Sequence, residues 1–122
     1  MKTRMLMAGC LLVAASGAQA QQATERFVPI GQSPGVSGKY AMMGTVVGYA
    51  DGMLTVASPA YPQPQRVRMM PSTRVWLDRS AAGQAALSGG AADLVAGRRI
   101  EIGYANAASR DAASWVKVQM AP

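Results

Sequence analysis

The sequence predicts a mostly β protein that closes into a small barrel. Short runs of alternating apolar and polar residues recur along the chain, which is the pattern of strands with one buried face. Asp-Gly, Pro and Gly-rich stretches separate these runs, as turns do. The chain has 122 residues, enough for one domain. Because a sheet that closes on itself leaves no exposed edge, we expect a barrel, with a small open sandwich as the alternative.

The first twenty residues have the pattern of a secretory signal peptide. Lys2 and Arg4 precede an apolar run, residues 5–15, and the small residues Ala18 and Ala20 follow at the spacing that a signal peptidase requires. We therefore expect cleavage after Ala20, a periplasmic or secreted protein, and no transmembrane segment in the mature chain. A membrane anchor is the alternative, but the run is about half of the ~20 residues that span a bilayer.

Cys10 is the single cysteine of the sequence. The stretch Met7-Ala8-Gly9-Cys10 loosely resembles a lipoprotein box, so lipidation of Cys10 is a second alternative. The apolar run continues beyond Cys10, which favours the plain signal peptide. In that case Cys10 is removed with the signal, and the mature chain has neither a disulfide nor a thiol.

The mature chain is predicted to begin with a leader and to continue as the barrel domain. Residues 21–39 are polar and rich in Gly, Pro and Ser, which is typical of a flexible leader. Residues 27–30, Phe-Val-Pro-Ile, are the exception and are expected to dock on the domain as an irregular edge segment. Residues 40–122 are expected to form the barrel.

The strongest local signal in the domain is a β-hairpin. Two β-prone runs, residues 44–49 and 53–57, meet at the pair Asp51-Gly52, and Gly accepts a positive φ without cost. The consecutive apolar residues Val46 and Val47 predict a β-bulge near one of the glycines of the first run.

The remaining strands are expected to extend this hairpin. A proline-rich loop, residues 58–64, displays Tyr61 and leads to strands 65–70 and 73–77, which Pro71 separates. A helical insertion follows, with a short helix over 82–87 and one turn at 93–97 that Asp93 caps and Gly97 ends. The last two strands are expected at 98–105 and 115–120. This order fits a five- to six-stranded OB-like barrel with a short helical insertion.

The order of these segments resembles a family of small exported bacterial barrels that is known only as a domain of unknown function. The resemblance spans residues 43–118 and lies in Gly44-Thr45-Val46, in Asp51-Gly52-Met53-Leu54-Thr55-Val56, in Thr73-Arg74-Val75 and in residues 92–102, Ala-Asp-Leu-Val-Ala-Gly-Arg-Arg-Ile-Glu-Ile. It implies a fold and an exported setting, and no activity.

A second resemblance is to periplasmic copper chaperones of the CusF type, which are also five-stranded barrels. They bind Cu(I) with two methionines, a histidine and a tryptophan. In this chain Met69, Met70 and Trp76 lie in a comparable strand region, and there is no histidine. Thioethers are soft ligands that suit Cu(I), and methionine also fills irregular gaps in small cores. The resemblance therefore implies a Cu(I) site at these residues as an alternative to binding no cofactor.

The composition argues against catalysis. Without histidine and with one cysteine, a zinc site of His or Cys ligands is excluded and a nucleophilic triad lacks its usual base. No two acidic residues of the mature chain are spaced as an evident acid–base pair. We therefore expect a protein that is not an enzyme.

The best candidate surface is basic and aromatic. Arg66, Arg68, Arg74 and Trp76 share one face if the two strand segments belong to one sheet, and that mixture suits anions or sugars through charge and stacking. The alternative is a solvated face whose Arg stems cover apolar surface. The 12 basic residues against 6 acidic ones also favour anionic partners.

The sequence therefore predicts an exported binding or accessory module of the bacterial envelope. Its expected partners are an envelope protein, an anionic glycan or a lipid headgroup, rather than nucleic acid. The alternatives are a methionine-based periplasmic Cu(I)-binding protein and a structural subunit of an envelope assembly.

Overall fold

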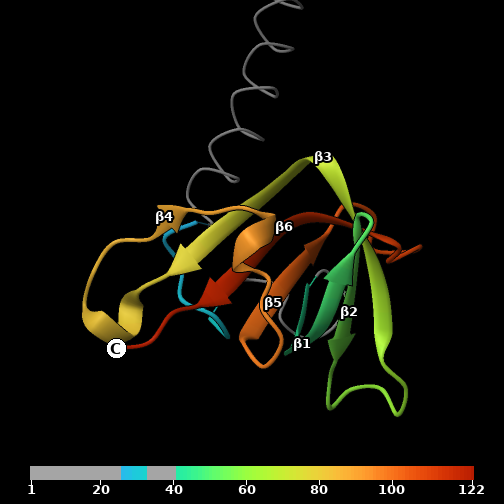
Figure 1. Ribbon diagram of the computed structural model, residues 1–122, viewed down its shortest axis with the longest axis horizontal. Coiled ribbons are helices and arrows are strands. Elements are labelled where there is room, and N and C mark those ends of the chain that lie inside the picture. Colours follow the sequence, from blue (N-terminus) through green and yellow to red (C-terminus); the bar gives the residue numbers. More distant parts are fainter. Residues whose placement is uncertain (1–25, 33–40) are drawn as a thin grey trace, which may run out of the picture.

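Five strands form a closed barrel in the computed structural model, which describes residues 26–32 and 41–122 (Figure 1). The described residues contain six strands, of which all but β4 belong to the ring: β1 (Ala41–Ala50), β2 (Met53–Ala57), β3 (Gln65–Asp78), β4 (Leu87–Ser88), β5 (Arg99–Tyr104) and β6 (Ala112–Gln119). The sheet order is β2-β1-β5-β6-β3, and pairing of β2 with β3 closes the ring. β3 and β6 are parallel, and β4 pairs with the end of β3 outside the ring. The predicted mostly β barrel is confirmed.

The hairpin of β1 and β2 confirms the strongest local prediction. Asp51 and Gly52 both have positive φ, 53° and 76°, as the tight turn of a twisted two-residue hairpin requires. The pairing of the two strands shifts register between Val46 and Gly48. The predicted bulge therefore lies at the second glycine of β1.

β3 is one continuous strand, whereas we expected two segments on either side of Pro71. The strand bends sharply near its middle (Figure 1). Its pairing with β6 shifts register between Met69 and Arg74, and Pro71 lies within that irregular stretch. Proline lacks a donor, so it is tolerated where the ladder is interrupted. The bend directs the two halves of β3 toward different neighbours.

The expected helix over 82–87 is wrong. A single 3₁₀ turn, Ser80–Ala82, ends at Gly83, whose φ of 69° stops further winding, and β4 begins at Leu87. The helical turn expected at 93–97 is wrong in its position: the 3₁₀ turn lies at Ala91–Asp93, so Asp93 is its last residue instead of its N-cap, and residues 94–97 are not helical. The Asp93 carboxylate accepts a hydrogen bond from Gly90 N at 2.9 Å, and Gly97 has a φ of 91°.

The core lies inside the barrel and draws on every strand of the ring. Val46, Leu54, Val67, Ile100 and Val116 are each at most 2% exposed. These residues come from the predicted apolar faces of alternating strands, so the alternation identified the inner face correctly. Burial of aliphatic side chains contributes about 1.5–3 kcal/mol each and is the main stabilising term.

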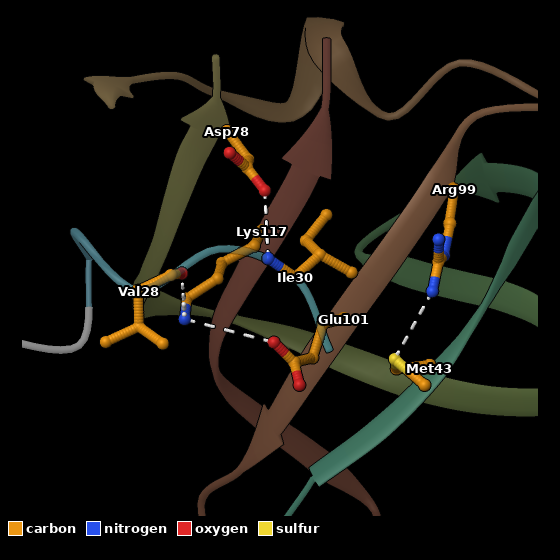
Figure 2. A network of polar contacts seen from close by, with 7 residues as sticks. All are labelled: Val28, Ile30, Met43, Asp78, Arg99, Glu101 and Lys117. Carbon is orange, nitrogen blue, oxygen red and sulfur yellow. Dashed lines mark hydrogen bonds and ion pairs between the residues drawn. The ribbon is translucent and has the colours of Figure 1, made fainter. Parts of the chain in front are cut away.

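Residues 26–32, which we call the strap, lie on the outside of the barrel. A second buried layer lies beneath the strap. Two hydrogen bonds join it to the sheet in Figure 2: Ile30 N donates to Asp78 Oδ2 at 2.9 Å, and Lys117 Nζ donates to Val28 O at 2.8 Å. The expected docking of 27–30 is confirmed, but on the outer face of β3, β5 and β6. Residues 1–25 and 33–40, with the predicted signal peptide, Ala18, Ala20, Cys10 and most of the leader, lie outside the described residues.

The strap covers an ion pair. Lys117 Nζ lies 3.9 Å from Glu101 Oε1, and the two side chains are 1% and 0% exposed. The two residues face each other across β6 and β5 (Figure 2). Lys117 also lies over the Trp115 ring, 4.7 Å from its centroid. These two charged side chains on the outer face of the barrel are therefore as inaccessible to solvent as the residues of its core.

Candidate functional site

β3 carries three exposed arginines, Arg66, Arg68 and Arg74. Within the described residues, none of the three guanidinium groups has a hydrogen bond, an ion pair or a ring contact. Each of the other basic side chains there contacts a partner, as the following contacts show: Arg26 with Phe27, Arg79 with Ala85, Arg98 with Asp93, Arg99 with Met43, Arg110 with Tyr61, and Lys117 with Glu101. In the described part of the chain, the arginines whose side chains have no partner are thus all on β3.

The structure brings Arg66 and Arg68 together. They lie opposite Thr55 and Met53 of β2 and project from the outer side of the sheet, while Val67 between them is buried. Two residues along a strand are about 6.6 Å apart, so their charges repel each other modestly. A ligand with spaced negative charges relieves this repulsion.

Two chain segments frame this arginine pair. Met69 N donates to Gly52 O in the hairpin turn at 2.7 Å, and Arg68 N donates to Asp111 O in the β5–β6 loop at 2.8 Å. Both segments also carry a carboxylate, Asp51 in the turn and Asp111 in the loop. The positive surface is therefore narrow and lies along β3.

Arg74 and Trp76 lie on the other half of β3, beside β6 instead of β2. Arg74 pairs with Trp115 and Trp76 with Lys117. The Trp76 ring stacks on the Trp115 ring with centroids 5.8 Å apart, and Trp76 is 5% exposed. The four predicted residues do not share one open face, because β3 bends between its halves and Trp115 covers the indole.

The Trp115 ring itself lies over Gly103 of β5. A Cβ atom added at Gly103 would come under 3.0 Å from three atoms of the indole. The glycine thus leaves the space that the ring fills, and the two tryptophans form an apolar patch on the outer wall. This patch explains why Trp76 is buried without belonging to the inner core.

Met69 of the Cu(I) hypothesis lies on the other side of the barrel wall from Trp76. Met69 is half-buried and packs against the inner core, whereas Trp76 packs outside it. Met70 N donates to Thr73 Oγ1 at 2.8 Å within the irregular part of β3. Met69 therefore fills a gap in the core. Residues 26–32 and 41–122 contain no group of three His, Cys, Asp or Glu side chains that could hold a metal ion.

A hollow of about 920 Å³ opens between the β2–β3 loop and the β5–β6 loop. Its lining includes Tyr61, which was predicted to lie on the proline-rich loop, and Tyr104 and Arg110, for which no site role was predicted. No local pattern marks Arg110, because its partner Tyr61 is 49 residues away. Burial and the nearby Tyr61 raise the pKa of Tyr104 above 10.0, while Arg110 opposes the rise, so the phenol is neutral at physiological pH.

Comparison of the chain with protein-family models, with curated proteins and with solved structures found no match. In the described part of the chain, no helix has the length and apolar character needed to cross a membrane.

Proposed function

We propose that this chain is an exported, non-enzymatic binding module of the bacterial envelope, and that Arg66 and Arg68 hold its anionic ligand. One observation carries the proposal: these arginines are exposed and unpartnered within the described residues, while the basic side chains outside β3 are engaged. An unpaired guanidinium keeps all five of its N–H donors for a ligand, and their planar arrangement matches carboxylates, phosphates and sulfates.

The strand order supports an OB-like interpretation of the barrel. The ring runs β1-β2-β3-β6-β5, the pairing of β3 with β6 is parallel, and the insertion with β4 lies between the third and fourth ring strands. Barrels of that kind bind oligonucleotides and oligosaccharides on the face of their second and third strands. Arg66 and Arg68 lie on the corresponding face, opposite β2.

The N-terminal pattern of Lys2, Arg4, the apolar run and Ala18-Gln19-Ala20 supports export. In the envelope the abundant polyanions are acidic glycans and the phosphorylated headgroups of lipids, so the ligand that we propose belongs to this class. Binding would rest on charge, and it would weaken as salt screens the arginines.

The test is retention of the purified protein on immobilised heparin, used as a polyanion, in a salt gradient. The variants Arg66→Gln and Arg68→Gln are each expected to bind about two- to fivefold more weakly, since an exposed ion pair contributes roughly 0.4–1 kcal/mol. Arg79→Gln is the matched control, because it removes the same charge from a side chain that already bonds to Ala85 O. Equal weakening by all three variants would show only a net-charge effect and would reject the site.

A further inference from the structure

The hollow beside Tyr61 has the size and the lining of a ligand site. Its volume, about 920 Å³, lies within the range of roughly 300–1,000 Å³ that small-molecule sites occupy. It lies between the β2–β3 loop, which carries Tyr61, and the β5–β6 loop, residues 105–111. Arg110 supplies the only charged side chain in its described lining.

Arg110 is held in place from three sides. Its Nε donates to Ala107 O at 3.1 Å, its Nη1 donates to Tyr61 OH at 2.8 Å, and its guanidinium carbon lies 5.9 Å from the centroid of the Tyr104 ring. The backbone of its loop is also fixed, since Arg110 N donates to Asn106 O at 2.9 Å. A guanidinium has five N–H donors, so three remain for a ligand.

Polar groups of several kinds surround this cation. Gln65 Nε2 donates a hydrogen bond to Gln63 O at 2.9 Å, so the side-chain oxygen of Gln65 remains as an acceptor. Asn106 and Ser109 also line the hollow, and the side-chain oxygen of Asn106 accepts hydrogen bonds from Ala108 N and Ser109 N. The nearby carboxylate of Asp111 accepts a hydrogen bond from Ser109 Oγ at 2.9 Å, and it is the acidic group closest in sequence to Arg110.

Aromatic surface completes the site. Tyr61 lines this hollow and also an apolar groove of about 520 Å³, so it contributes to the walls of both. The face of a phenol ring carries partial negative charge, and it attracts the weakly positive C–H groups of a sugar ring. Acceptors and donors at the rim match the hydroxyl groups of a sugar.

We propose that this pocket binds a sugar ring that bears a carboxylate, such as a uronic acid residue of a glycan. The carboxylate bonds to the remaining N–H groups of Arg110, the planar fork of which fits two carboxylate oxygens. The ring lies against Tyr61, and its hydroxyls reach Gln65, Asn106 or Ser109. This site is separate from the arginine pair on the outer face of β3, and it stands whether or not that pair binds a polyanion.

The experiment is isothermal titration calorimetry of the purified full chain with trigalacturonate, and neutral maltotriose is the comparison ligand. We expect saturable binding of the acidic trisaccharide and at least about tenfold weaker binding of the neutral one, because hydrogen bonds to a charged group are the strong ones. Arg110→Gln should reduce affinity for trigalacturonate by about tenfold or more. Tyr61→Phe, which removes the hydroxyl that orients Arg110, should reduce it by a smaller factor.

Arg79→Gln is the matched control for Arg110→Gln. Arg79 also uses Nε for a backbone carbonyl, Ala85 O at 2.8 Å, and Nη1 for a side-chain oxygen, Gln84 Oε1 at 3.0 Å, but it lies outside the hollow. Affinity should be unchanged in Arg79→Gln. The proposal is overturned if trigalacturonate does not bind, if maltotriose binds as well, or if Arg110→Gln binds like the wild type. Loss of binding in Arg66→Gln/Arg68→Gln together with wild-type binding in Arg110→Gln would place the ligand on β3 and would also overturn the proposal.

Discussion

Removing Lys117 should destabilise the protein far more than removing a comparable surface cation. Lys117 and Glu101 are 1% and 0% exposed, so Lys117→Met removes the cation that lies 3.9 Å from the carboxylate in a place that water does not reach. Breaking a buried pair costs about 3–5 kcal/mol. The lost hydrogen bond to Val28 O adds about 1 kcal/mol. The free energy of unfolding of native proteins is about 5–15 kcal/mol, so the variant should lose a large share of its stability.

The assay is equilibrium urea unfolding of Lys117→Met, Glu101→Met and the double variant. Well-packed apolar residues can replace a buried pair at little cost, so the double variant should recover most of the loss, with a coupling of at least about 2 kcal/mol. Arg98→Met is the control, because Arg98 and Asp93 have the same 3.9 Å separation at side-chain exposures of 36% and 30%. It should cost about 1 kcal/mol or less. If Lys117→Met costs no more than Arg98→Met, burial does not set the strength of the pair and the reasoning is refuted.

Two further perturbations test the outer layer. Gly103→Ala should destabilise the protein by about 1–3 kcal/mol in the same unfolding assay, because the new methyl group displaces the Trp115 ring. Gly48→Ala is the control: its methyl group meets nothing within 4 Å, so the variant should be neutral or stabilising. Equal effects of the two variants would contradict the packing argument. Burial raises the pKa of Asp78, but hydrogen bonds from Ile30 and Ser80 and the charge of Lys117 outweigh it, so the pKa lies below 3.8. The ionised form thus stabilises the fold above about pH 3.8, and this stability is lost as the pH falls through the folded-state pKa. Asp78→Asn should flatten that part of the stability–pH profile, and an unchanged profile would exclude Asp78 as its source.

The local features of the fold were predictable because each is determined by adjacent residues. The Asp51-Gly52 turn, the strand Met53–Ala57 and the inner face of β5 follow from turn chemistry and from alternation. The continuity of β3 through Pro71 was not predictable, since it depends on where the pairing with β6 shifts register. The missing helix over 82–87 has a similar cause: alanines favour a helix locally, but Gly83 ends the turn and Leu87 pairs with β3.

The residues of the candidate site were likewise predictable only where adjacent residues determine their exposure. Alternation along β3 correctly predicts that Arg66 and Arg68 are exposed, because their neighbours in sequence face the core. The same alternation suggests an open Trp76, but its exposure is decided by Trp115, which arrives from another strand. The pocket around Arg110 joins two loops that are distant in sequence, so a pattern of neighbouring residues does not reveal it.

The strap also constrains the order in which the chain folds. Its hydrogen bonds to the sheet span 48 residues to Asp78 and 89 residues to Lys117, and the latter lies on the last strand. Contacts of such long sequence separation form late, because closing the intervening loop costs entropy before the contact can form. A chain that emerges N-terminus first therefore cannot seat the strap until β6 is in the barrel. A chain that is truncated before β6 would lack the surface on which its strap docks. Its N-terminal residues would then stay exposed, and proteases could cleave them.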